Sequence, residues 1–392
     1  MSALRAPLAP DRSGRWLTDP GFGVYVHVPF CKHRCHYCDF NTYEGRDDLH
    51  DAYVDALITE ILSLSASRAA TSVFFGGGTP TLLRASRLGE ILGALRSSVG
   101  IAEGAEITAE ANPETVDECY FEELRAAGFN RVSIGVQSLV PRVLLGLGRT
   151  HTPQRALEAL SAARSAGFAD VNADVIYGSP WEGAEDWEAT LRGIAAAEPD
   201  HVSAYALTIE EGTPLSTLIR TGRVADVDPD VQAERYERAC TVLADAGYER
   251  YEVSNWARPG HASRHNVLYW SAGDYVGLGA GAHAHAGGRR SWTVRLPRDY
   301  IDAASAGRST EAGAEELDLD ERAGEALMLG LRLRAGIDLD SFGARFGSDA
   351  LAARAAALDD LVGQGLLVRE GPVVRLADSA TLVANEVLCR LL

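Results

Sequence analysis

Apolar runs and helical patterns alternate along the first two thirds of the chain. Apolar residues at helical spacing predict helices at about 49–65, 82–98, 117–127, 153–166 and 184–197. Short β-branched and aromatic runs between them predict strands at 22–28, 73–75, 106–110, 131–136, 171–177 and 201–207. Six βα units of this kind imply a parallel sheet covered by helices, with functional loops at the carboxyl ends of the strands. We therefore predict an α/β fold built on an incomplete (β/α)6 TIM-like barrel.

The pattern changes towards the carboxyl end of the chain. A helix near 230–247, a strand at 249–255 and a Gly-rich segment through Gly288 are predicted extensions of the barrel. From about residue 320, helical patterns precede two short apolar runs joined by a Gly-Pro turn, which predicts a winged-helix-like module. The predicted units are an N-terminal tail (1–20), the barrel with its extensions (21–302), a linker (303–319) and a small C-terminal domain (320–392).

Charge limits the partners that the chain can bind. Its 392 residues carry a formal net charge of −18, which disfavours contact with a phosphate backbone. Residues 317–392 hold eight Arg and no Lys against twelve acidic residues, so we expect the winged-helix-like module to pack or dock rather than bind nucleic acid. With neither a signal peptide nor a membrane span in the sequence, we predict a soluble cytoplasmic protein.

Three of the six cysteines are crowded into the loop after the first predicted strand. Cys31, Cys35 and Cys38 follow a CxxxCxxC pattern, whereas the other three stand alone in helical patterns. Thiolates are the natural ligands of iron–sulfur centres, and three ligands leave the fourth iron of a [4Fe–4S] cluster open. The amino and carboxylate groups of S-adenosylmethionine (SAM) can chelate such an iron. The alternative is a zinc site completed by His33 or His36, although zinc motifs usually pair two CxxC-like halves.

The cysteine motif followed by Gly76-Gly77-Gly78-Thr79-Pro80 after the second strand resembles the radical-SAM superfamily. Within it, the segments YVHVPFC, GGGTPT, GVQS (135–138) and DVIYG (174–178) resemble the oxygen-independent coproporphyrinogen III oxidase group over nearly the whole chain. The resemblance implies cofactor contacts at Tyr25, Tyr37, Gly78, Thr79, Glu110, Gln137, Arg149, Asp174 and Ala206. The alternative for the polar strand-end residues Glu110, Gln137 and Asp174 is that they satisfy neighbouring loop amides.

Two departures separate the chain from the oxidases of that group. Phe40 stands where those enzymes carry a further Cys, and the cysteine motif begins at residue 31, which leaves no room for the N-terminal segment that covers their porphyrinogen. The sequence CDF at 38–40 and the segment HNVLYW at 265–270 instead resemble the heme-chaperone (HemW) branch. This resemblance implies heme binding at His265, beside the flat apolar rings of Tyr269 and Trp270. Alternatively, these aromatic rings are core residues and His265 caps a loop.

His283 and His285 lie in a Gly-rich segment and are further candidates for contact with heme, with a buried hydrogen-bonded role as the alternative. The sequence thus predicts a radical-SAM-type heme chaperone that binds a [4Fe–4S] cluster, SAM and heme, with no catalytic residue assigned. It would transfer heme to an acceptor hemoprotein near the membrane surface, and the sequence leaves homodimer formation open. The main alternative is an oxygen-independent coproporphyrinogen III oxidase, and a third is a zinc-stabilised interaction protein.

Overall fold

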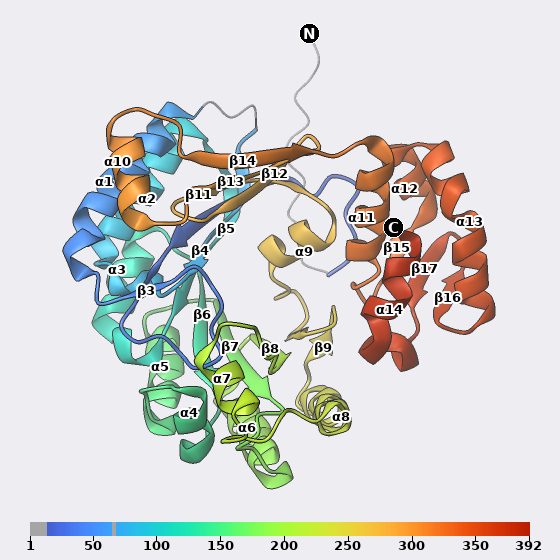
Figure 1. The fold of residues 1–392 in the computed structure, drawn as a ribbon, viewed down its shortest axis with the longest axis horizontal. Coiled ribbons are helices and arrows are strands. Elements are labelled where there is room, and N and C mark those ends of the chain that lie inside the picture. The colour runs from blue at the N-terminus through green and yellow to red at the C-terminus, as the bar shows by residue number, and fades with distance from the viewer. Residues whose placement is uncertain (1–13, 65–67) are drawn as a thin grey trace.

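The computed structural model describes residues 14–64 and 68–392. Its centre is a curved, open sheet in which six parallel strands are adjacent in chain order (Figure 1). They are β1 (Phe22–Val28), β4 (Ala70–Gly77), β5 (Ile101–Ala111), β6 (Arg131–Gln137), β7 (Asp170–Tyr177) and β8 (His201–Ala206). Helices connect successive strands, and the predicted incomplete (β/α)6 barrel is confirmed.

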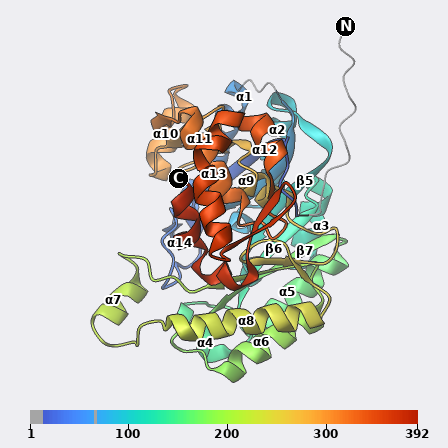
Figure 2. The same cartoon turned by 90° about the vertical axis from the view of Figure 1, so that its right-hand side faces the viewer.

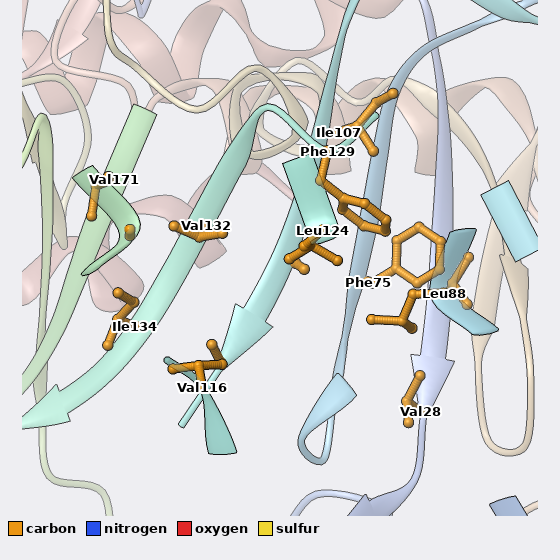
Figure 3. Packing of buried hydrophobic residues seen from close by; sticks show 14 of the residues in the cluster. Val28, Phe75, Leu88, Ile107, Val116, Leu124, Phe129, Val132, Ile134 and Val171 are labelled. Atoms are coloured by element: carbon orange, nitrogen blue, oxygen red, sulfur yellow. The ribbon is translucent and has the colours of Figure 1, made fainter. Parts of the chain in front are cut away.

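Helices cover the convex face of this sheet (Figure 1). They are α1 (His50–Ser63), α2 (Ala85–Ser98), α3 (Glu118–Ala127), α4 (Pro141–Leu147), α5 (Pro153–Ser165), α6 (Ala184–Ala197) and α8 (Pro229–Asp245). Between the two layers lies the main apolar core, where Phe75 and Phe129 pack with Leu88 of α2 and Leu124 of α3 (Figure 3). The two phenylalanine ring centroids are 5.0 Å apart. Because strand residues alternate between faces, Phe74, the neighbour of Phe75 in β4, points into the barrel.

The inner face of the barrel is polar, and a short helix closes part of it. Buried inner residues include Ser72, Glu106, Arg131, Asn172 and His201. Helix α9 (Arg264–Trp270) begins against the Glu106 carboxylate, which accepts hydrogen bonds from the backbone N–H groups of Arg264 and His265, each at 3.0 Å. A carboxylate at this position satisfies amides that a helix N-terminus leaves unpaired.

Both edges of the parallel sheet are extended by short strands. Strand β11 (Asp274–Leu278) pairs parallel with β1, and β12 (His283–Ala286), β13 (Arg289–Thr293) and β14 (Glu311–Glu316) follow antiparallel. Strand β14 lies within the predicted linker 303–319, and α10 (Pro297–Ser305) spans the predicted domain end at residue 302. The domain boundaries at residues 302 and 320 therefore remain predictions from the sequence.

The predicted continuous strand at 249–255 is wrong. The segment forms two short antiparallel strands, β9 (Glu249–Arg250) and β10 (Asn255–Ala257), at the far edge of the sheet. The chain turns between them because Tyr251 is buried, and its hydroxyl is hydrogen-bonded to His201 Nε2 at 2.9 Å. The segment 249–255 therefore contains a turn around Tyr251 as well as parts of two strands.

The C-terminal domain is winged-helix-like, as predicted. Helices α11 (Leu319–Gly330), α12 (Leu339–Phe346) and α13 (Ser348–Gly363) pack beside a three-stranded sheet, followed by α14 (Ala384–Leu388) (Figure 2). That sheet has the order β15 (Ile337–Asp338), β17 (Val373–Leu376) and β16 (Leu367–Glu370). No helix in the described part of the chain is long and apolar enough to cross a bilayer.

The described part of the predicted N-terminal tail joins the core of this C-terminal domain, while residues 1–13 of that tail lie outside the described residues. The Trp16 side chain is buried, and its ring centroid lies 6.4 Å from that of Phe342. The Leu17 N–H donates a hydrogen bond of 3.0 Å to the Ser271 hydroxyl. Trp16 and Leu17 thus link α12 of the C-terminal domain to Ser271, which follows α9.

Replacing Trp16 with alanine is expected to lower the free energy of unfolding by about 3 kcal/mol, since it leaves a cavity in the C-terminal core. Urea unfolding followed by circular dichroism measures the change. Leu319→Ala is the control, because Leu319 is 54% exposed and its truncation should leave the midpoint nearly unchanged. An unshifted midpoint for the Trp16 variant would contradict the packing role.

Candidate cofactor site

A cavity of about 500 Å³ lies at the carboxyl ends of the barrel strands. All three motif cysteines line it. So do eight of the residues for which the sequence predicted cofactor contacts, namely Tyr37, Gly78, Thr79, Glu110, Gln137, Arg149, Asp174 and Ala206. These residues come from the cysteine loop and from five different strands or their following loops. The fold thereby brings residues that are up to 175 positions apart in the sequence, from Cys31 to Ala206, to the wall of one cavity.

The three motif cysteines are free thiols, each half-buried at the cavity wall. Burial is the main cause that raises the pKa of Cys31, to about 11, so an iron that binds this sulfur must displace its proton. The side chain of Thr79 donates to Cys31 Sγ at 3.8 Å, and Arg149 Nη1 donates to Cys35 Sγ at 3.4 Å. Such donors stabilise the thiolate form that ligates iron.

The cysteine arrangement fits an iron–sulfur cluster. A four-iron cluster takes one thiolate on each of three irons, so its ligands need not converge on a single point. Among the residues that the structure describes, no group of three His, Cys, Asp or Glu side chains could hold one metal ion. His36 and His33, on which the zinc alternative depends, have other partners: His36 Nδ1 is bonded to the Gly146 carbonyl at 3.0 Å, and His33 Nδ1 lies 3.4 Å from Glu44.

A chain of hydrogen bonds connects two of the cysteines through the cavity wall. Arg149 Nη2 donates to Asn112 Oδ1 at 2.7 Å, and Asn112 Nδ2 donates to Thr79 Oγ1 at 2.9 Å. Since Arg149 contacts Cys35 and Thr79 contacts Cys31, this chain fixes the spacing of the two sulfurs. Asn112 was not among the predicted site residues, although its position directly after the β5 strand could have indicated it.

The Gly-rich loop packs directly on the cysteine loop. The Gly78 N–H donates to the Val28 carbonyl at 2.8 Å, and the Thr79 N–H donates to the Phe30 carbonyl at 2.7 Å. A Cβ atom at Gly78 would lie 2.5 Å from the Phe30 carbonyl oxygen, a distance that real Cβ atoms do not adopt. Glycine is therefore required at this position by close backbone approach.

Two half-buried carboxyl groups, Glu110 and Asp174, face the same cavity. Burial, reinforced by the Asp174 charge, raises the pKa of Glu110 to about 8, against the opposing hydrogen bond from the Gly77 N–H at 3.1 Å. Burial also raises the pKa of Asp174, which accepts hydrogen bonds of 2.8 Å from both Ser133 and Asn172. Two acids that repel each other in a low-dielectric site favour a cationic ligand.

The backbone of Gln137, the last residue of β6, is strained. Its φ angle is +62°, in the left-handed region that side chains other than glycine rarely adopt. Strain of this kind is concentrated at ligand-binding sites because the surrounding structure must hold it in place. The alternative for Glu110, Gln137 and Asp174 was that they only satisfy neighbouring loop amides. Glu110 does accept a hydrogen bond from a loop amide, but all three residues also line the cavity.

Tyr25, an expected cofactor contact, and His265 do not line the cavity, and the rings of both stack on Phe74. The Tyr25 hydroxyl is bonded to His27 Nδ1 at 2.9 Å. His265 stacks on Phe74 with ring centroids 5.3 Å apart, and its Nδ1 and Nε2 are bonded to Ser72 and Tyr269, each at 2.9 Å. Burial lowers the pKa of His265 to about 3. The imidazole is neutral and, with both nitrogens bonded, offers no free ligand atom in this arrangement.

Comparison with known proteins agrees with this geometry. The family model described as the radical SAM superfamily matches residues 25–194, and the HemN C-terminal domain model matches residues 317–383. A protein named heme chaperone HemW from Mycobacterium tuberculosis is 42% identical over 378 residues, which is 95% of either chain. This chain belongs to the HemW group of radical SAM proteins. The HemW of Escherichia coli is 34% identical and aligns with 94% of this chain and 97% of its own length.

The fold of this HemW-group chain is similar to that of an enzyme of known structure. Coproporphyrinogen III oxidase (HemN) from Escherichia coli superimposes with a TM-score of 0.81 and 22% identity, covering 97% of this chain and 92% of its own. This similarity shows that the two proteins share their architecture. At the cavity mouth, the chain carries Phe40 as a 63% exposed apolar side chain.

Proposed function

We propose that this protein is a heme chaperone that binds a [4Fe–4S] cluster and SAM in the 500 Å³ cavity, binds heme, and transfers heme to an acceptor hemoprotein. One observation carries the proposal. The cavity is lined by the three motif cysteines, the Gly-rich loop and two carboxyl groups, and relatives that align over nearly the whole chain are named heme chaperones. An acceptor at the membrane surface and the formation of a homodimer stay predictions.

Each residue of the cavity has a separate task in this proposal. Cys31, Cys35 and Cys38 would hold the cluster, which supplies an open iron for the amino and carboxylate groups of SAM when bound. Thr79 and Arg149 hold the sulfurs in place by the hydrogen bonds described above. Glu110 and Asp174 supply negative charge at the cavity wall for the sulfonium and amino groups of SAM.

The competing activity is oxidative decarboxylation of coproporphyrinogen. Anaerobic reconstitution of the cluster, followed by parallel assays, separates the two functions. We expect stable heme binding in the absorbance assay and no conversion of coproporphyrinogen to protoporphyrinogen when SAM and a reductant are added. Robust turnover without stable heme binding would overturn the chaperone proposal, and a zinc-containing, colourless product would overturn the cluster.

Binding of SAM is expected to strengthen as pH rises from 6 towards 8. Glu110, with a pKa of about 8, is mostly protonated at pH 7 in the ligand-free site, and a bound cation favours its ionised form. Binding therefore releases a proton, and affinity should rise by up to about tenfold per pH unit below that pKa. Calorimetry in two buffers of different ionisation enthalpy measures the released proton.

Glu110→Gln is the matched control for this prediction, because the amide keeps the shape but cannot titrate. The variant should bind SAM more weakly at pH 8 and lose the part of the pH dependence that the ligand itself does not cause. An identical pH profile in the variant and the parent would show that another group releases the proton.

A further inference from the structure

A chain of hydrogen-bonded polar side chains runs through the inside of the barrel, from the cofactor cavity towards the C-terminal domain. It begins at Asp174, which lines the cavity. It continues through the buried side chains of Asn172 on β7, His201 on β8 and Tyr251, and ends at Asn266 on α9. None of the four residues beyond Asp174 lines the cavity or has a task in the proposed function.

The contacts along this chain are all at hydrogen-bonding distance. Asn172 Nδ2 lies 2.8 Å from Asp174 Oδ1, and Asn172 Oδ1 lies 2.7 Å from His201 Nδ1. His201 Nε2 lies 2.9 Å from the Tyr251 hydroxyl, which in turn lies 3.0 Å from Asn266 Nδ2. Pairing alone is what any buried polar group requires, so the distances by themselves are compatible with a purely structural role.

What distinguishes the chain is that all its donors point towards Asp174. An ionised carboxylate only accepts, so the Asn172 amide presents its N–H to Asp174 and its oxygen to His201. The imidazole must donate to that oxygen from Nδ1, and burial keeps the ring neutral by lowering the pKa of His201. His201 Nε2 therefore accepts from the Tyr251 hydroxyl, whose oxygen accepts from Asn266 Nδ2.

Asp174 depends on these donors because burial opposes its charge. Burial raises the pKa of the Asp174 carboxyl, and hydrogen bonds from Ser133 and Asn172 counteract that rise, as does the Arg131 guanidinium. Asn172 also supports the Ser133 donor, since its Nδ2 donates to the Ser133 hydroxyl at 2.6 Å. Hydrogen bonds in series polarise one another, so each donor further along the chain strengthens the one that reaches Asp174.

The far end of the chain is fixed by the C-terminal domain and by α9. Tyr251 belongs to the apolar core that α11, α12 and α13 form, and its carbonyl accepts a hydrogen bond of 2.9 Å from the Arg334 N–H. Asn266 lies in the HNVLYW segment, whose helix is held at its start by the Glu106 carboxylate. Asn266 thus links this segment to the cofactor cavity through three intervening side chains.

We propose that Asn172, His201 and Tyr251 are positioning residues for the SAM site, which pass the donor direction from α9 to Asp174 and hold its carboxylate as an acceptor at the cavity wall. The inference rests on the proposed function, in which Asp174 contacts SAM. The Tyr251 hydroxyl is the decisive group. Without it Nε2 has no donor, the imidazole proton is no longer confined to Nδ1, and the bond from Nδ1 to the Asn172 oxygen weakens.

A double-mutant cycle on SAM affinity, measured by calorimetry on the reconstituted full-length protein, tests the proposal. We expect Tyr251→Phe to weaken SAM binding about fivefold, since it keeps the ring but removes one donor from the chain. Asp174→Asn should weaken binding more, and adding Tyr251→Phe to it should cause no further loss, because the amide has no charge to stabilise. An equal loss in both backgrounds would show that Tyr251 acts through packing alone and would overturn the proposal.

Tyr248→Phe is the matched control. Tyr248 is buried, and its hydroxyl donates to the Pro199 carbonyl at 2.6 Å, so the substitution removes a hydroxyl of the same kind that takes no part in the chain. It should leave SAM affinity unchanged, and a loss as large as that of Tyr251→Phe would contradict the role of the chain. Iron and sulfide content of the reconstituted cluster checks that each variant is folded.

Nuclear magnetic resonance of the parent protein with isotope-labelled histidine tests the direction of the chain without weakening it. We expect the His201 ring, assigned by its absence in His201→Asn, to be the Nδ1–H tautomer, and an Nε2–H tautomer would overturn the proposal. If Asp174→Asn alone left SAM affinity unchanged, the proposed contact of Asp174 with SAM would fail together with this inference. If Asp174→Asn weakened binding but Tyr251→Phe did not, only this inference would fail.

Discussion

Replacing Cys35 with alanine is expected to abolish the iron–sulfur cluster. Cys35 is one of three thiols on a single loop, and an Arg149 guanidinium 3.4 Å from its sulfur is placed to stabilise the thiolate. Without it, only two protein ligands remain for a four-iron cluster, and the buried cation loses its sulfur partner. Iron and acid-labile sulfide analysis after anaerobic reconstitution should show nearly complete loss, together with loss of the brown colour.

Cys119→Ala is the control for this experiment. Cys119 is a free, exposed thiol on α3 and does not line the cavity, so its removal should leave iron and sulfide content unchanged. Full iron content in the Cys35 variant would show that the cluster ligands lie elsewhere. Full SAM binding without a cluster would show that the open iron does not anchor SAM.

Substituting Gly78 with alanine is expected to weaken SAM binding strongly while the protein stays folded. The new Cβ would lie 2.5 Å from the Phe30 carbonyl oxygen and 2.8 Å from that of Val28, both of them backbone atoms that cannot rotate away. The Gly-rich loop must then move off the cysteine loop, which breaks the Thr79 contact to Cys31. We expect SAM affinity to fall at least a hundredfold by calorimetry, about 3 kcal/mol.

Gly93→Ala is the matched substitution for Gly78→Ala. Gly93 lies inside helix α2, and a Cβ there meets nothing within 4 Å. Alanine at a helical, unhindered position stabilises the fold by about 0.5–1 kcal/mol, and SAM affinity should be unaffected. If Gly78→Ala also bound SAM normally, the close backbone approach would have no part in the site.

The sequence predicted the barrel and the cofactor cavity because their signals are local. Each strand of the parallel sheet is a short apolar run, and the cysteines, the Gly-rich loop and the polar strand-end residues follow directly on those runs. In a parallel sheet, residues at the carboxyl ends of the strands must meet at one edge. The alternation of strands and helices therefore places Cys31, Glu110 and Asp174 at one edge of the sheet, whereas the cofactor contacts of Glu110 and Asp174 were implied by the family resemblance.

The remaining features depend on contacts between distant segments. Whether His265 faces a ligand or the core is decided by Ser72 and Phe74, which lie about two hundred residues earlier in the chain. The strand predicted at 249–255 turns because Tyr251 binds His201, again a contact that periodicity does not contain.

The position of Trp16 has a consequence for how the chain folds during translation. Trp16 is synthesised more than three hundred residues before its partner Phe342. Until then, this indole has no native partner in α12, while the βα units between them can already form from contacts that are local in sequence. The packing of Trp16 against α12 is therefore a late step in folding, possible only after α12 has been synthesised.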